Sequence, residues 1–113
     1  MNYRSLFSNI SYCGLVKSKK NDFHILEGPQ DYVVVSTNYQ YSIVPKKAVR
    51  FIVKRLGGTV NVTVAEAFAV CHGSMYFPDR FAVLHALYVL VATKQGRIAK
   101  ISSKLFFNIW KGE

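Results

Sequence analysis

The sequence RFAVLHALYVLVATKQGRIAKISSKLFFNI, residues 80–109, changes halfway along from a helical pattern to a β pattern. Its first half is apolar on nearly every face of a helix, which is typical of a helix that is buried or held in an interface. We expect this helix to begin in the turn at residues 78–79 and to run to about Lys94, with Gly96 as its C-terminal stop. In the second half, residues 97–101 alternate polar and apolar side chains, and residues 105–110 return as a second strand after the short polar turn 102–104, which predicts a β-hairpin.

Two shorter helices are expected upstream. Residues 46–56 carry apolar side chains at helical spacing, and Pro45 before them and two glycines after them fit the ends of a helix. A short β-like segment follows at residues 59–62. Thr63 and the glutamate three residues later have the pattern of a capping box, in which each side chain satisfies a free backbone donor of the other residue. This pattern predicts a short helix over residues 64–71.

The N-terminal part has a different character. We expect residues 1–22 to form an irregular arm that ends in a polar turn, and residues 23–44 to form a small β element that packs on the main domain. Within this element, the β-branched and aromatic run at residues 32–37 and the alternating run at residues 39–43 predict two strands of a hairpin. Residues 45–113 form the third segment, which holds the expected helices and the C-terminal hairpin.

In this third segment the expected order is helix, short strand, capped helix, turn, longer helix and hairpin. The order resembles the winged-helix superfamily, a variant of the helix-turn-helix, over residues 49–56, 59–69 and 81–109. The passage over residues 84–98 is similar to the step from the third helix into the wing of that fold. The resemblance implies an α+β fold: a winged helix of three helices plus a C-terminal β-hairpin wing, preceded by the small N-terminal β element. The few acidic residues and the many Val, Ile, Tyr and Lys residues also resemble small archaeal proteins.

The length and composition of the chain limit the classes of function that it can have. A chain of 113 residues fits one domain, and a hydrophobic content of 50% excludes wholesale disorder. The formal net charge is +9, which points to phosphate-bearing partners or anionic surfaces. Residues 1–45 carry four basic and three acidic groups, whereas residues 46–113 carry eleven basic and three acidic groups. The excess of +8 in the second part locates the expected binding surface there.

Three groups of residues are candidates for nucleic-acid contacts. The first is the polar face of the helix at residues 46–56, where cations recur at four-residue spacing. The second group lies at the start of the third helix, where free backbone N–H groups attract phosphate. The third group is the predicted wing together with Arg97, which leads into it. The alternative for each group is an ordinary solvated surface. The candidate residues are Lys46, Lys47, Arg50, Lys54, Ser74, Arg80, Arg97, Lys100, Ser103 and Lys104.

The resemblance and the charge together imply a DNA-binding protein, a transcription regulator or a chromatin-associated protein of the cytoplasmic nucleoid, that binds double-stranded DNA through phosphate contacts. The third helix offers Arg80 and His85 but few other polar side chains for base edges, so little sequence reading is expected. This hypothesis includes a homodimer, whose contact is made by this helix or by the aromatic N-terminal section. Two alternatives stay open: a small ribosome-associated protein that binds structured RNA, and a winged-helix module for protein–protein interaction.

No residue pattern predicts catalysis, a cofactor or a metal site. The carboxylates are scattered, a glycine-rich phosphate loop is missing, and Cys71–His72 has no partner at metal-ligand spacing. We therefore expect neither an enzyme nor a small-molecule substrate. Cys13 and Cys71 do not make a disulfide framework, and the sequence shows neither a signal peptide nor an apolar run long enough to span a membrane. These features predict a reduced cytoplasmic protein without a membrane partner.

Three tyrosines and one histidine need a separate interpretation. Tyr32, Tyr39 and Tyr41 lie in the predicted strands and are candidates for stacking on the bases of a single strand. Packing against the sheet or the neighbouring helix is the favoured interpretation for all three. His85, on the apolar third helix, is expected to be a packed or partly exposed ring.

Overall fold

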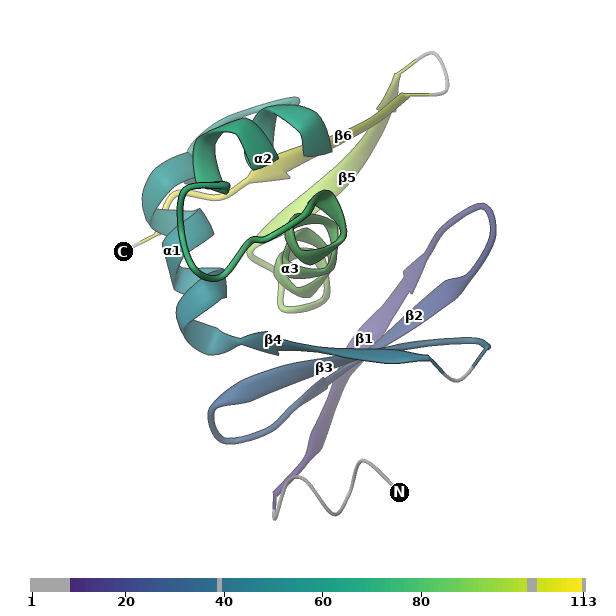
Figure 1. Ribbon diagram of the computed structural model, residues 1–113. Coiled ribbons are helices and arrows are strands. Elements are labelled where there is room, and N and C mark those ends of the chain that lie inside the picture. Colours follow the sequence, from purple (N-terminus) through teal and green to yellow (C-terminus); the bar gives the residue numbers. More distant parts are fainter. Residues whose placement is uncertain (1–8, 39, 102–103, 113) are drawn as a thin grey trace.

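The chain folds into a four-stranded sheet, then three helices, then a two-stranded sheet (Figure 1). The computed structural model describes residues 9–38, 40–101 and 104–112. Its elements are β1 (Ser11–Lys17), β2 (Asp22–Glu27), β3 (Asp31–Ser36), β4 (Tyr41–Pro45), α1 (Lys46–Leu56), α2 (Val64–Cys71), α3 (Arg80–Ala92), β5 (Gly96–Ile101) and β6 (Lys104–Ile109). The fold class is α+β, as expected, and both sheets are antiparallel. Among the described residues, no helix combines the length and the apolar character that crossing a membrane requires.

The first sheet is a meander in which each strand pairs with the next, in the order β1-β2-β3-β4. β3 and β4 form the expected hairpin, with Tyr32 opposite Val44. Ile25 of β2 and Val34 of β3 lie directly opposite each other and are both buried in the core. This face of the sheet packs on α3, so Val16, Ile25, Val34 and Val44 are buried within the chain itself.

Strand β1 corrects the expectation of an irregular arm over residues 1–22. Residues 11–17 pair with β2, and a bulge between Tyr12 and Gly14 shifts the register. A bulge of this kind breaks the regular alternation by which a strand is recognised in a sequence. Val16 is the one side chain of β1 that is buried. Hydrogen bonding to β2 therefore holds a segment that has little apolar pattern of its own.

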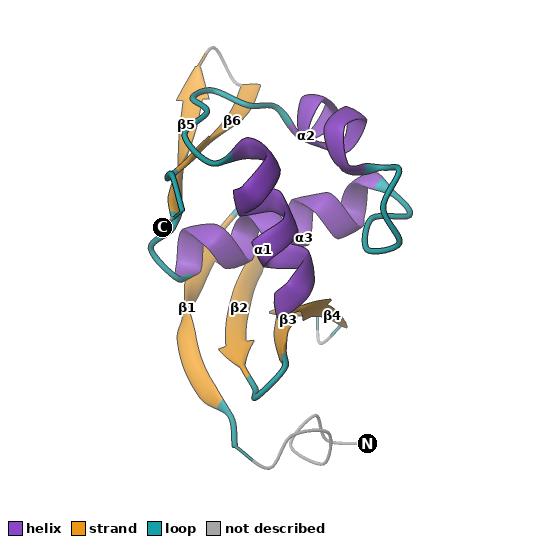
Figure 2. Ribbon diagram, turned by 90° about the vertical axis from the view of Figure 1, so that its left-hand side faces the viewer, coloured by secondary structure: helices purple, strands orange, loops and turns teal. Residues whose placement is uncertain are grey.

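α3 is the central helix of the molecule. Figure 1 shows it between the first sheet and the layer formed by α1, α2 and the β5–β6 hairpin, and Figure 2 shows the three helices together above the first sheet. α3 contacts all four strands of that sheet as well as α1, α2 and β5. Most of its side chains are therefore buried: Val83, Ala86, Leu87, Tyr88, Val89, Leu90 and Ala92. The expected burial is confirmed for these residues, while Phe81 in the first turn of α3 is exposed.

The starts of the helices follow local signals. α1 and α2 have the expected bounds, and Thr63 and Glu66 form both hydrogen bonds of the capping box. α3 begins at Arg80 rather than in the turn before it, because Asp79 is its N-cap. The Asp79 carboxylate accepts a hydrogen bond from the Ala82 N–H at 2.9 Å, which satisfies one of the free donors of the first turn.

The end of α3 corrects a second expectation. The helix ends at Ala92, and Lys94 rather than Gly96 takes the left-handed conformation, with φ of 64°. Gly96 is instead the first residue of β5. A Cβ atom at Gly96 would lie 2.6 Å from the carbonyl oxygen of Asn108, so the close approach of β6 is what requires a glycine here.

The two C-terminal strands form the expected hairpin, with Gly96 opposite Ile109 and Ile101 opposite Lys104. Val62, in the segment before α2, adds a bridge to it, because its N–H and its carbonyl each make a 2.8 Å hydrogen bond with Phe107. Ser103, in the predicted tip of the hairpin, lies outside the described residues.

Candidate nucleic-acid interface

The four candidate cations of α1 divide into two kinds. Lys47, Arg50 and Lys54 are exposed to solvent, whereas Lys46 lies against the first sheet. The amine of Lys46 donates a hydrogen bond to a carboxylate oxygen of Glu27 at 2.7 Å. This hydrogen bond raises the pKa of Lys46. The Lys46 charge is thus engaged within the chain, whereas Lys47, Arg50 and Lys54 make no ion pair with the described carboxylates.

The start of α3 differs from the phosphate site that the sequence suggested. Arg80 is exposed there, but Ser74 is half-buried and its hydroxyl oxygen accepts the Tyr76 N–H at 3.3 Å. The Asp79 carboxylate occupies the N-terminal end of the helix. A negative side chain in this position takes the place of a bound anion, so the geometry gives no support to a phosphate on the N–H groups of this turn.

The candidate lysines of the C-terminal hairpin lie where the sequence predicts them. Lys100 and Lys104 are exposed toward the end of the β5–β6 hairpin. Lys100 is directly opposite Leu105, and Ile98 lies two residues before Lys100 on the same face of the strand. Arg97 is exposed and belongs to the opposite face. One face of the hairpin therefore combines a lysine with two apolar side chains.

Lys100 on this face of the hairpin and the turn between β1 and β2 form the two walls of a groove. The groove has a volume of about 630 Å³. Lysines from both walls line it, and apolar side chains of β2, α3 and the hairpin form its floor. We call it the lysine groove; it is lined by Lys17, Ser18, Lys19, Lys20, Asn21, Phe23, Leu84, Tyr88, Ile98, Lys100 and Leu105.

The turn that carries Lys19 and Lys20 is held by hydrogen bonds. The Ser18 N–H donates to the Asn21 carbonyl at 3.1 Å, and the Asn21 N–H donates back to the Ser18 hydroxyl at 3.2 Å. Thr37, in the neighbouring turn, donates its hydroxyl to the Asn21 side-chain oxygen at 3.3 Å. The two lysines therefore lie at the tip of a turn with a defined conformation, on one wall of the groove.

The floor of the groove is apolar and firmly packed. Leu84, Ile98 and Leu105 are half-buried, so each presents part of its side chain to the groove. The half-buried ring of Phe23 has its centre 5.0 Å from the ring centre of Tyr88, which is itself buried. The floor is thus a preformed apolar surface between two basic walls.

The charges of the groove are of one sign. Four lysines line it and no carboxylate does; Asp22, opposite Lys17 in the register of β1 and β2, is not part of the lining. Over the part of the chain that the structure describes, Lys46 with Glu27 is the one ion pair. The ammonium groups of the groove are therefore not neutralised by the described carboxylates.

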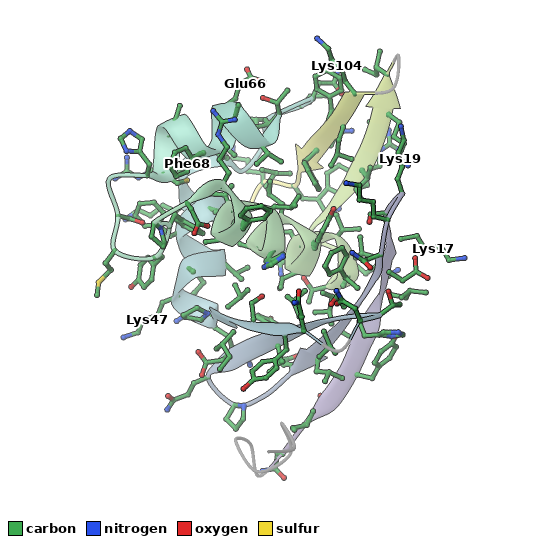
Figure 3. All side chains as sticks on the ribbon, turned by 45° about the vertical axis from the view of Figure 1, so that its right-hand side comes forward. Lys17, Lys19, Lys47, Glu66, Phe68 and Lys104 are labelled. Atoms are coloured by element: carbon green, nitrogen blue, oxygen red, sulfur yellow. The ribbon has the colours of Figure 1, made fainter. Side chains whose placement is uncertain are left out.

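The candidate cations do not form a single surface. Figure 3 places Lys17 and Lys19 on the opposite side of the molecule from Lys47, with Lys104 above them near the end of the hairpin. Of the candidate contact residues that the structure describes, Lys100 alone lines the lysine groove. Sequence reasoning read the three lysines of residues 17–20 as a polar turn. Three lysines within four residues are a signal in the sequence, but nothing in the sequence places that turn beside the β5–β6 hairpin.

Three of the other singled-out side chains, those of Tyr32, Cys71 and His85, are buried or half-buried. Cys71 is fully buried in the core, and burial raises the pKa of its thiol. Tyr32 is buried, as the packing interpretation predicted, while Tyr41 is exposed and Tyr39 lies outside the described residues. His85 is half-buried, with its Nδ1 atom 2.8 Å from the Ser42 hydroxyl oxygen. Within the described residues, no cluster of His, Cys, Asp or Glu is suited to hold a metal ion.

Comparison with known proteins gives no relative: no family model, no curated protein and no solved structure matches this chain.

Proposed function

We propose that this chain is a nucleic-acid-binding protein whose residues 45–113 form a winged-helix domain. The order of α1, α2, α3 and the β5–β6 hairpin supports the winged-helix assignment. The bridge between Val62 and Phe107 supports it further, because it adds the segment before α2 to the hairpin as a third short strand. The net charge of +9 supports a polyanionic partner.

The observation that carries the proposal is the lysine groove. Lys19 and Lys20 are separated in sequence from Lys100 by the whole helical part of the chain, and the fold brings them to one groove that no carboxylate lines. Lysine binds phosphate as a point charge, and a series of phosphates is the partner that several such charges on two walls suit best.

Contacts to the phosphate backbone dominate this mode of binding. The first sheet covers α3, the helix that enters the major groove in DNA-reading relatives of the winged-helix fold. Base-edge reading by α3 therefore has no support in the geometry. We expect affinity to depend on charge and on salt, with little preference for sequence.

Fluorescence anisotropy with labelled oligonucleotides tests the proposal. A 20-base-pair DNA duplex, an RNA hairpin and a single strand are titrated with the protein between 50 and 300 mM KCl. If the four groove lysines each neutralise one phosphate of a duplex, the logarithm of the affinity falls with the logarithm of salt with a slope of about −3.6. Binding to at least one of the three probes with a steep salt dependence is expected. Absence of binding to all three at 50 mM KCl, or binding that salt leaves unchanged, would overturn the proposal.

A further inference from the structure

We propose that the lysine groove takes a single strand of nucleic acid, with its phosphates on the lysine walls and its bases on the apolar floor. This inference rests on the proposed nucleic-acid binding and specifies which form of nucleic acid the groove accepts. It assigns a role to Lys17, Lys19, Lys20 and Phe23, which the resemblance to winged-helix proteins does not single out.

The apolar floor is the first argument for a single strand. A duplex presents its phosphates outward and keeps its bases stacked inside, so it would engage the lysines and leave Leu84, Ile98 and Leu105 uncovered. A single strand carries unstacked bases that can lie on such a floor, as bases do in proteins that combine a basic groove with aromatic side chains. The half-buried ring of Phe23, packed against Tyr88, is the aromatic part of this floor.

The position of the lysines is the second argument. Lys17, Lys19 and Lys20 line the groove from the β1–β2 turn, and Lys100 lines it from the hairpin. A strand between the two walls therefore has cations on both sides of its backbone. Lys104 pairs with Ile101 and so belongs to the opposite face of the hairpin, which leaves Lys100 as the described lysine of the hairpin that lines the groove.

A peptide with acidic and apolar side chains is the other ligand that fits a groove of this chemistry. The single strand is favoured because it carries one negative charge at every residue, which matches the density of lysines on the β1–β2 turn. A peptide needs acidic side chains at several specific positions to reach the same charge density.

Two matched double variants test the groove. Lys19→Glu/Lys20→Glu reverses two charges on the groove wall, and Lys47→Glu/Lys54→Glu reverses two exposed charges on α1, on the opposite side of the molecule. Both variants have the same net charge, so a general loss of attraction for polyanions affects them alike. Because all four lysines are exposed, both variants are expected to fold, and circular dichroism and thermal melting check this.

The probes are labelled dT12, a twelve-residue abasic strand with the same phosphates, a twelve-base-pair duplex, and a twelve-residue peptide of alternating Asp and Leu. We expect dT12 to bind more tightly than the duplex, and at least tenfold more tightly than the abasic strand, because the abasic strand lacks the bases that contact the floor. We expect the Lys19/Lys20 variant to lose at least tenfold in affinity for dT12 and the Lys47/Lys54 variant to lose less than threefold. Four phosphate contacts to a single strand predict a salt slope of about −2.8 for the unaltered protein.

Several outcomes separate this inference from the proposed function. Equal binding of dT12, abasic strand and duplex would show that phosphates alone are bound, which overturns the inference and leaves nucleic-acid binding intact. Equal losses in the two variants would place the strand outside the groove and overturn the inference as well. Tighter binding of the Asp–Leu peptide than of dT12 would assign the groove to a protein partner. No binding of any nucleic acid would overturn both proposals.

Discussion

The side-chain amine of Lys46 lies 2.7 Å from a carboxylate oxygen of Glu27, which joins the first turn of α1 to strand β2. The same amine lies 5.5 Å from the centre of the Tyr32 ring, on the neighbouring strand β3. The backbone N–H of Lys46 donates to the Gln30 carbonyl at 3.0 Å. A cation that the sequence places among the candidate phosphate ligands is thus a link between the helical part of the chain and the first sheet.

Because Lys46 makes these contacts within the chain, we expect its substitution to lower the stability of the protein and to leave the binding of nucleic acid nearly unchanged. Ion pairs at partly exposed sites contribute about 0.2–1 kcal/mol, so we expect Lys46→Met to lower the free energy of unfolding by about 0.5 kcal/mol. We expect the affinity for dT12 to change by less than twofold, since Lys46 does not line the lysine groove. Urea denaturation and anisotropy measure the two quantities. A tenfold loss of affinity with unchanged stability would show that Lys46 contacts the ligand after all.

The burial of His85 predicts a dependence of stability on pH. Burial lowers the pKa of His85 below its ordinary value of 6.5, and the charge of Asp79 opposes this shift only in part. The unfolded chain therefore binds this proton more readily than the folded chain does. The contribution of neutral His85 to stability is fully present above about pH 6.5 and is lost as pH falls through the lower pKa of the folded state.

Urea denaturation between pH 7.5 and pH 5 measures this effect. We expect the free energy of unfolding to fall over this interval in the unaltered protein. In His85→Gln, whose side chain does not titrate, the fall is expected to be smaller. An identical pH dependence in the two proteins would contradict the role of His85.

The approach of β6 to Gly96 predicts a large effect of adding one methyl group. A Cβ at residue 96 would lie 2.6 Å from the Asn108 carbonyl oxygen, and this oxygen is part of the backbone and cannot rotate away. We expect Gly96→Ala to lower the free energy of unfolding by about 2 kcal/mol. Gly73→Ala is the matched control, because a Cβ there would meet nothing within 4 Å. Similar losses in both variants would show that the hairpin adjusts to the added group.

How much of this fold the sequence predicts depends on how local each signal is. The starts of α1 and α2 can be predicted because the signals that define them, Pro45 and the Thr63 capping box, act within one turn of the helix. Strand β1 was missed because its evidence is its pairing with β2, across a bulge next to Gly14. The C-terminal stop of α3 was placed at Gly96 because glycine usually fills that position, whereas here the approach of another strand requires it.

The candidate site also combines features that the sequence predicts with features that it does not. The burial of α3 was predicted from its apolar faces, but the sheet that covers it is formed by residues too distant in sequence to be assigned to it. Lys100 was singled out from its position in the predicted wing. Lys19 and Lys20 were not, because their partner in the groove lies some 80 residues away, at Lys100, and nothing in one sequence connects the two segments.

The two exposed lysines of the hairpin predict different effects on single-strand binding. Lys100 lines the lysine groove, whereas Lys104 does not. With a strand of six nucleotides, we expect Lys100→Gln to make the salt slope shallower by about 0.7, the contribution of one phosphate contact. Lys104→Gln is expected to leave the slope for this short strand unchanged. Equal changes in the two variants would show that the strand follows the end of the hairpin and not the groove.

The most direct test of the account is to map where a single strand binds on the unaltered protein. A titration of 15N-labelled protein with dT12, followed by NMR, reports on each backbone amide. The lysine groove predicts the largest shift changes at residues 17–23, at Ile98 to Lys100 and at Leu105, with little change at residues 47–54 of α1. Shift changes concentrated on α1, with the groove amides unchanged, would contradict the account.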